Sequence, residues 1–223
     1  MIELKDVRKK YSSEQGDVNV LNDLSLKIEH ADFVSLLGRS GEGKSTLLNI
    51  LGGFDNFDEG EYLFDDIDVS DFEERQLSQF RMDNIGFVFQ SFHLIKHLTV
   101  SKNIELPLLL QKVPEKERQQ RSQDILERLG IGDKGDYYPN QLSGGQCQRA
   151  AIARALITRP RLILADEPTG ALDRETADNI LSLFRDLNAD GHTIVMVTHD
   201  PLVAQSAAKT LELHQGQLRE RHD

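Results

Sequence analysis

The 223-residue chain is poor in cysteine and in long apolar runs. Its one cysteine, Cys147, excludes an intrachain disulfide and suits a reducing compartment. We interpret Cys147 as a small buried side chain near a helix start. The longest apolar stretches, such as Leu106–Leu110 and Leu162–Ala165, fall far short of the ~20 residues that a bilayer-spanning helix needs. Residues Met1–Asp6 also lack the apolar core of a signal peptide, so we expect neither a membrane span nor export by the usual signal.

Basic charge is also scarce. The chain has 26 Lys and Arg against 37 Asp and Glu, a net charge of −11, and no basic block long enough to follow a phosphate backbone. Nucleic acid is therefore not an expected partner. The length suits one α/β domain, or a domain that carries an inserted subdomain.

A phosphate-binding pattern is present at Gly38–Ser45, which fits G-x-x-x-x-G-K-[ST] without a gap. The apolar run Phe33–Leu37 predicts a strand before it, and Lys44–Leu51 predicts a helix after it. Glycines let the backbone turn so that its N–H groups and the helix start face an anion. Lys44 would contact β- and γ-phosphates, and the Ser45 hydroxyl would bind Mg²⁺. The plainer alternative is a glycine-rich turn before a helix.

The remaining periodicities predict an α/β fold. Alternating apolar residues at Ile2, Leu4 and 24–28 favour antiparallel strands at the N-terminus. Strands at Arg161–Ala165 and Thr193–Thr198, with a helix between them, favour a parallel sheet covered by helices. We expect a P-loop NTPase core with a mainly parallel sheet, an N-terminal antiparallel β region and an inserted helical subdomain. The whole chain, 1–223, would be a single domain, with the core and β region at about 1–90 and 160–223 and the helical subdomain at about 91–159.

Within the helical stretch, Pro114 is placed like a first helical residue before a helix over Glu115–Leu129, and Gly130 is placed as its stop. The apolar residues Ile125, Leu126 and Leu129 lie among charged and amide side chains. This pattern predicts an amphipathic surface helix.

Two further segments suit nucleotide chemistry. The strand before Asp166 and Glu167 ends in these adjacent carboxylates, so Asp166 is a candidate Mg²⁺ ligand and Glu167 a candidate for orienting the attacking water. The alternative is an exposed turn pair. The segment Leu142–Gln146 runs into an Ala-rich helix and predicts a second anion-binding helix start. Because one loop already wraps the nucleotide, a second cradle suggests that a second copy of the chain closes over it.

In combination these motifs resemble the ATP-binding subunit of ABC transporters over essentially the whole chain. Their order and rough spacing match that family at Gly38–Ser45, Gln90, Leu142–Gln146, Asp166–Glu167, Ala171–Asp173 and His199. The resemblance implies ATP and Mg²⁺ as ligands and a head-to-tail homodimer that hydrolyses ATP at its interface.

The resemblance also implies a role for each matching residue. Phosphate contacts in cis would come from Gly38, Arg39, Ser40, Gly41, Glu42, Gly43, Lys44, Ser45 and Thr46, and contacts in trans from Ser143, Gly144, Gly145 and Gln146. Gln90 would reach Mg²⁺ and the attacking water, His199 would be the switch histidine, Asp173 would link the two sites, and Tyr11 would stack on adenine. Taken singly, His199 is more often a structural residue and Tyr11 ordinary packing. Glu42 departs from the small residue usual in this loop and would weaken ATP binding unless it points outward.

Local segments around residues 51–55, 85–92, 103–108 and 165–173 resemble the lipoprotein-release and macrolide-export group, the LolD and MacB types. This implies a permease partner with few membrane spans and a large extracytoplasmic domain, outward or mechanical transport, and a place on the cytoplasmic face of the inner or plasma membrane. The permease would contact apolar side chains after Gln90, or these would form the subdomain core: Phe92, Leu94, Ile95, Leu98 and Val100. Alternatives are a regulatory ATPase resembling the cell-division protein FtsE, and a soluble ABC ATPase acting on DNA or ribosomes.

Overall fold

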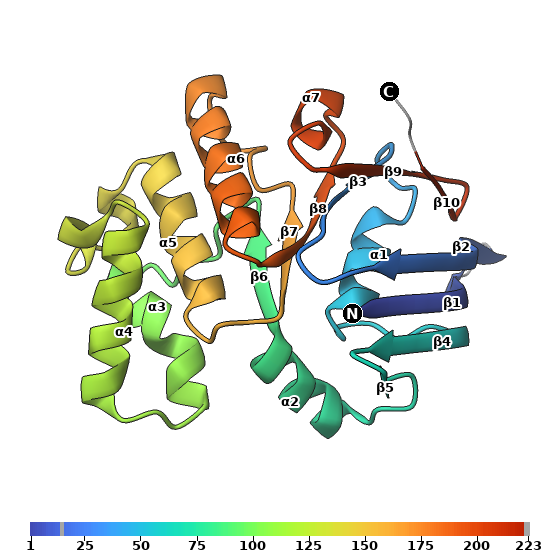
Figure 1. Ribbon diagram of the computed structural model, residues 1–223, viewed down its shortest axis with the longest axis horizontal. Coiled ribbons are helices and arrows are strands. Elements are labelled where there is room, and N and C mark those ends of the chain that lie inside the picture. The colour runs from blue at the N-terminus through green and yellow to red at the C-terminus, as the bar shows by residue number, and fades with distance from the viewer. Residues whose placement is uncertain (14–15, 221–223) are drawn as a thin grey trace.

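The computed structural model describes residues 1–13 and 16–220. Figure 1 shows a small sheet near the N-terminus, a larger central sheet, and a group of helices on the far side of that larger sheet. In the described residues the small sheet is antiparallel with the order β2-β1-β4-β5, and the larger one has the order β10-β9-β3-β8-β7-β6. The strands of the small sheet are β1 (Ile2–Ser13), β2 (Gly16–Ile28), β4 (Glu59–Phe64) and β5 (Ile67–Asp68).

The larger sheet is parallel from β9 to β6, and only β10 joins it antiparallel. This arrangement confirms the predicted mainly parallel sheet and the antiparallel N-terminal region. The strands of the larger sheet are β3 (Phe33–Leu37), β6 (Ile85–Phe89), β7 (Leu162–Asp166), β8 (Thr193–Thr198), β9 (Lys209–His214) and β10 (Gln217–Glu220).

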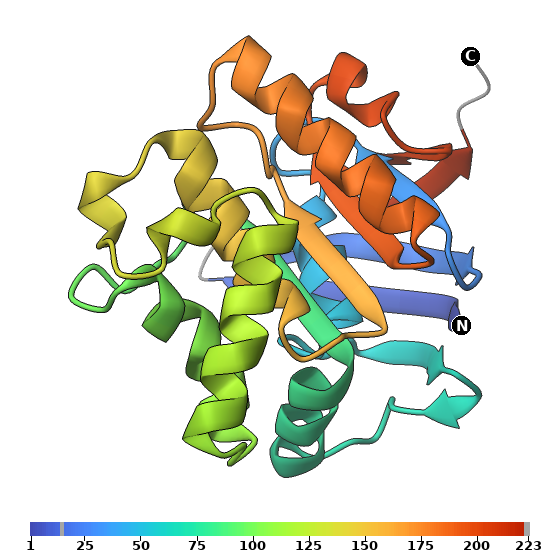
Figure 2. The ribbon, with the colours of Figure 1, turned by 60° about the vertical axis from the view of Figure 1, so that its left-hand side comes forward.

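Helices cover both faces of the larger sheet, and Figure 2 shows α6 crossing in front of it. Helix α1 packs between the two sheets, and the opposite face carries α3 to α6. The helices are α1 (Lys44–Leu51), α2 (Glu74–Asn84), α3 (Val100–Leu110), α4 (Glu115–Arg128), α5 (Gly144–Leu156), α6 (Arg174–Ala189) and α7 (Pro201–Ala204), with 3₁₀ turns at η1 (Gly132–Lys134) and η2 (Pro139–Gln141).

Strand β7 shows why both faces of the larger sheet must be buried. Leu162 and Leu164 belong to the core between the sheets, whereas Ile163 and Ala165 belong to the core under the helices. Successive strand residues point to opposite faces, so a continuous apolar run is stable only when both faces are buried. The polar residue Asp166 follows where the strand leaves this double core.

One sequence prediction about the fold needs adjustment. Pro114 is the residue before α4, with φ −56° and ψ 144°, and not its first helical residue. Its extended ψ is incompatible with the helix, although its fixed φ still suits a helix start. Gly130 follows α4 with φ +70°, as expected for a glycine that ends a helix. Cys147 is buried, and burial raises the pKa of its thiol, in accord with a packing role.

Candidate functional site

The loop between β3 and α1 depends on glycines at two positions. Gly41 and Gly43 have φ of +86° and +97°, which side chains with a Cβ rarely adopt. A Cβ on Gly43 would also lie 2.7 Å from a methyl carbon of Val20 on β2. Helix α1 begins at the next residue, Lys44. The loop therefore turns tightly against β2 and presents a helix start, which favours a bound anion.

A cavity opens at this helix start, and we call it the phosphate cavity. It is lined by Val20, Ser40, Gly41, Gly43, Lys44, Ser45, Thr46, Gln90, Asp166, Glu167, Val197 and His199. The structure thus brings loop residues together with Gln90, Asp166, Glu167 and His199, four of the polar residues that the sequence predicted beyond the loop. Val20 and Val197 were not predicted, because each is an ordinary strand valine outside any motif.

Lys44 is buried and already oriented by the loop. Its ammonium nitrogen Nζ donates to the carbonyl oxygens of Gly38 and Arg39, at 2.7 and 2.8 Å. An ammonium has three N–H donors, so one donor remains for a phosphate oxygen. Gly38 and Arg39 do not line the phosphate cavity. Their observed contribution is to hold Lys44 through their carbonyl groups.

Glu42 turns away from the phosphate cavity. One carboxylate oxygen accepts the backbone N–H of Arg39 at 2.7 Å, and the other lies 3.1 Å from Nδ1 of His214 at the end of β9. The Arg39 N–H, followed by His214, lowers the pKa of the Glu42 carboxyl. The negative charge of Glu42 is therefore directed to the Arg39 backbone and to β9, and not to the phosphate cavity. No motif marked His214, which comes from a strand that the sequence did not predict.

The carboxyl end of β7 places two acids at the cavity wall. Asp166 is the last residue of the strand, and burial raises the pKa of its carboxyl, with the charge of Glu167 adding to the rise and that of Lys44 opposing it. Glu167 has φ +47°, a strained conformation for a residue with a side chain. Such strain persists where the surroundings hold it, often at functional sites.

Glu167 is held by two partners on the neighbouring strand β8 and just after it. Nδ1 of His199 lies 2.6 Å from one carboxylate oxygen, and the Thr198 hydroxyl donates to the other at 3.3 Å. His199 is 69% exposed and Glu167 19% exposed, so the pair lies at the rim with the carboxylate inside. Thr198 was missed in the sequence, because it is indistinguishable there from the other β-branched residues of its strand.

Gln90 follows β6 and packs against the turn after Glu167. A Cβ on Gly170 would lie 2.8 Å from the Gln90 side-chain nitrogen, so only glycine fits there without displacing the amide. The side chain of Gln148, buried on α5, donates to the carbonyl of Pro168 at 2.7 Å. The turn that carries Gly170 is thus held between Gln90 and α5.

Ser143 and Gln146 form a reciprocal cap at the start of α5. The Ser143 hydroxyl accepts the Gln146 N–H at 3.3 Å, and the Gln146 side-chain oxygen accepts the Ser143 N–H at 2.9 Å. Gly144 is exposed, and a Cβ on Gly145 would lie 2.6 Å from the methyl carbon of Thr176. None of the four residues Ser143–Gln146 lines the phosphate cavity of the same chain.

Tyr11 and Asp173 also lie outside the residues that line the cavity. The Tyr11 hydroxyl donates to the Asp55 carboxylate, and the ammonium of Lys9 lies 4.9 Å from the centre of the Tyr11 ring. Asp173 caps α6 by accepting the N–H and the hydroxyl of Thr176, at 3.0 and 2.7 Å. Adenine stacking by Tyr11 and a cross-dimer role for Asp173 stay predictions.

Comparison with known proteins places this geometry in a family. The sequence model of the family described as "ABC transporter" matches residues 21–170. The chain belongs to the ABC transporter ATP-binding proteins. It is 46% identical over 218 residues to the uncharacterized ABC transporter ATP-binding protein YvrO of Bacillus subtilis, covering 98% of this chain and 95% of that protein.

Two other comparisons extend the ABC assignment. The macrolide export ATP-binding/permease protein MacB of Salmonella typhimurium is 45% identical over 218 residues, which is 98% of this chain and 34% of MacB. A dimeric structure of the ATP-binding cassette MJ0796 in a post-hydrolysis state, bound to ADP and Pi, aligns with a TM-score of 0.90 and 43% identity over 99% of this chain and 98% of that one. The chain is therefore an ABC ATPase, and it spans about a third of the length of MacB.

The cavity of this ABC ATPase fits Mg²⁺ as well as phosphate. Ser45, Asp166 and Gln90 all line it and supply hydroxyl, carboxylate and amide oxygens. Mg²⁺ prefers hard oxygen ligands and is usually held by one or two protein groups together with substrate phosphates and water.

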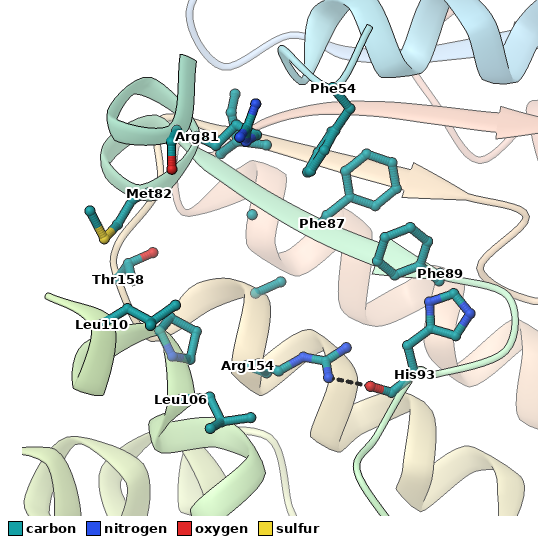
Figure 3. A pocket seen from close by; sticks show the side chains of 15 residues that line it. Phe54, Arg81, Met82, Phe87, Phe89, His93, Leu106, Leu110, Arg154 and Thr158 are labelled. Carbon is teal, nitrogen blue, oxygen red and sulfur yellow. Dashed lines mark hydrogen bonds between the residues drawn. The ribbon is translucent and has the colours of Figure 1, made fainter. Parts of the chain in front are cut away.

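Figure 3 shows a second cavity, the aromatic groove, whose lining residue Phe89 directly precedes Gln90 of the phosphate cavity. It is lined by Phe54, Ser78, Arg81, Met82, Ile85, Gly86, Phe87, Phe89, His93, Leu106, Pro107, Leu110, Arg154, Ala155 and Thr158. Along one wall Phe54 meets Phe87 edge to face, Phe87 stacks on Phe89, and Phe89 packs on His93, at ring-centre distances of 5.5, 4.3 and 4.5 Å. This row joins the end of α1 to the turn after Gln90.

Of the residues predicted as either permease contacts or core, Val100 is fully buried within the helical core. Leu94 packs against that core, whereas Ile95 is 36% exposed. Phe92 and Leu98 are half-buried, so only Val100 of the five is fully buried, and contact of the others with a permease stays a prediction. No helix in the described part of the chain is both long and apolar enough to span a bilayer.

Proposed function

We propose that this ABC ATPase drives a membrane permease by closing, as a head-to-tail homodimer, around two MgATP molecules. The observation that carries this proposal is the position of Ser143–Gln146, a capped helix start that lies outside the phosphate cavity of its own chain. An anion-binding helix start left without its own cavity suits the nucleotide of a second chain. The dimeric form of the MJ0796 cassette supports this assembly.

The cavity residues divide the chemistry in a consistent way. Lys44 contacts the β- and γ-phosphates, while Ser45, Asp166 and Gln90 would hold Mg²⁺, which would supply positive charge to the phosphate oxygens. Glu167 orients the attacking water and polarises it. His199 contacts Glu167 at 2.6 Å and responds to the γ-phosphate, so it acts as the switch between the open and closed forms.

The proposed permease partner follows from MacB, which is described as an ATP-binding and permease protein and of which one segment is similar to this chain. We propose that a helix of a separate or fused permease docks in the aromatic groove. Leu110, 71% exposed at the groove, offers an apolar contact beside the row of aromatic rings. The ATPase then lies on the cytoplasmic face of the inner or plasma membrane, and ATP closure powers export or mechanical extrusion.

We further propose that residues 1–223 act as a single ABC ATP-binding domain, with about 91–159 as its helical subdomain. Helices α3, α4 and α5 pack on one another and share one buried cluster. Because α5 also packs on β6, movement of this subdomain would alter both the groove and the position of Ser143.

The test is affinity purification of the Glu167→Gln chain from detergent-solubilised membranes, with and without MgATP. Recovery of a permease with a large extracytoplasmic domain is the expected result. Capture of a membrane partner tied to cell-wall hydrolases would replace transport by a regulatory role, and the absence of any membrane partner would overturn both.

A pair of surface variants tests the docking site itself. Leu110→Arg introduces a charge at the groove, whereas Leu202→Arg does the same at a leucine on α7 that is 66% exposed and outside the groove. We expect Leu110→Arg to lose the permease and to keep ATP binding. Equal loss with Leu202→Arg would show that docking does not depend on the groove.

A further inference from the structure

The turn just after Gln90 is strained at two consecutive residues. Phe92 and His93 have φ of +58° and +48°, in the left-handed region that side-chain residues avoid. The turn is tight, because the His93 N–H donates to the carbonyl of Ser91 at 2.5 Å. A strained backbone persists only where the surrounding structure holds it.

Arg154 holds this turn from the other side. Its guanidinium nitrogens Nη1 and Nη2 donate to the carbonyl oxygens of His93 and Phe92, at 2.5 and 2.8 Å, and Figure 3 shows the first of these bonds. Burial lowers the pKa of the Arg154 guanidinium, and no carboxylate charge among the described residues opposes this effect. The planar fork of the guanidinium is thus committed to the two carbonyls of the strained residues.

The position of Arg154 connects three parts of the molecule. It lies near the end of α5, the helix that begins after Ser143. Its carbonyl partners follow Gln90 within three residues, and both Arg154 and His93 line the aromatic groove. A shift of α5, or of a molecule in the groove, would therefore act on the turn that sets the direction of Gln90.

We propose that Arg154 is a positioning residue for ATP hydrolysis, which acts by holding the strained turn at Phe92–His93 so that Gln90 reaches the Mg²⁺ and water positions. The inference depends on the proposed role of Gln90.

Arg149 provides a matched control on the same helix. It donates from Nη1 to the carbonyl of Leu129 at 2.9 Å, inside the helical segment and away from the turn. Arg154→Lys and Arg149→Lys both keep the charge and the flexible stem but lose the planar fork. A general weakening of α5 would affect the two variants alike.

The experiment measures kcat, KM and MgATP affinity for Arg154→Lys, Arg149→Lys, His93→Gly and the Arg154→Lys/His93→Gly pair. We expect Arg154→Lys to lower kcat by about ten- to a hundredfold with little change in MgATP affinity, because Gln90 would be misplaced while the phosphate loop is intact. Glycine adopts the left-handed conformation without strain. The loss caused by Arg154→Lys should therefore be much smaller in the His93→Gly background.

Equal losses of kcat in both backgrounds, or an Arg149→Lys defect as large as that of Arg154→Lys, would overturn the proposal. Gln90→Ala is measured beside them, and normal hydrolysis in this variant would refute the proposed role of Gln90. The dependence of the Arg154→Lys loss on His93 would still show whether Arg154 acts through the turn. Should Arg154→Lys not fold, amide hydrogen exchange on the unaltered chain decides. The backbone amides of residues 91–95 should be protected from exchange as strongly as those of α5. Rapid exchange confined to residues 91–95 would refute the proposal that Arg154 holds the turn.

Discussion

Gly145 offers a quantitative test of the packing around the second helix start. In Gly145→Ala the new methyl would lie 2.6 Å from the Thr176 methyl carbon, well inside ordinary contact. Overpacking of this kind costs about 1–3 kcal/mol. Alanine in place of glycine in a helix returns up to about 1 kcal/mol. With that full return, the free energy of unfolding should fall by up to about 2 kcal/mol.

The partner substitution Thr176→Ser removes the methyl and keeps the hydroxyl that Asp173 accepts. Alone it should cost about 0.8 kcal/mol or less, because one partly buried methyl is lost. Combined with Gly145→Ala it should restore most of the lost stability. Urea unfolding of the four proteins in this cycle measures the coupling, and strictly additive effects would refute the close contact between the two residues.

The same cycle separates packing from nucleotide binding. A double variant that regains stability but does not form a MgATP-dependent dimer in the Glu167→Gln background would assign Gly145 a second role at the neighbouring nucleotide. Recovery of both properties would mean that the glycine is needed for packing alone. Size-exclusion chromatography with and without MgATP reads out the dimer.

Further predictions concern the phosphate cavity. Lys44→Ala should lose the charge-assisted phosphate hydrogen bond of its remaining donor, worth about 1.5–3 kcal/mol, measured as a fall in MgATP affinity and turnover. Glu167→Gln should keep MgATP binding but hydrolyse slowly and accumulate as a dimer, and normal turnover would exclude Glu167 as the residue that orients water. Because burial raises the pKa of Asp166 in the folded chain, folding favours its protonated form, and this stabilisation is present at low pH and lost as pH rises through the folded pKa. Asp166→Asn should therefore raise the Tm of the nucleotide-free protein at neutral pH, while abolishing Mg²⁺-dependent hydrolysis; an unchanged Tm would argue against the burial effect. Glu42→Ser should not tighten MgATP binding in a titration, since the carboxylate is already turned toward Arg39 and His214.

The local sequence was sufficient to predict an element where its hydrophobic pattern and the residues that end it are adjacent in the chain. The strand Phe33–Leu37 and the helix Lys44–Leu51 have the predicted bounds, because an apolar run leads into a glycine loop and then into helical spacing. Helix α2 was not predicted, since only Leu77 and Phe80 on it are buried and the rest of its sequence is mostly polar. Strand β9 depends on pairing with β3, far away in the sequence.

The site divides in the same way. Lys44 and Asp166 were predictable because their chemistry goes with a motif or a strand end, whereas Gln90 was predicted only from the family resemblance. His214 lies 172 residues after Glu42, so their contact depends on the register of β9 beside β3. Thr198 likewise contacts Glu167 only because β8 lies next to β7. Contacts of this kind depend on the assembled sheet and leave no local signal.

The separation of Ser143–Gln146 from the phosphate cavity in a single chain has a kinetic consequence. In the proposed dimer, hydrolysis needs two chains to meet, so the specific activity of dilute free chains should rise with protein concentration until dimers saturate. Two copies bound to one membrane partner instead experience an effective local concentration that tethering commonly places in the millimolar range. The permease would then do more than use the energy of ATP hydrolysis. By holding two ATPase chains together, it would also determine the rate at which they hydrolyse ATP.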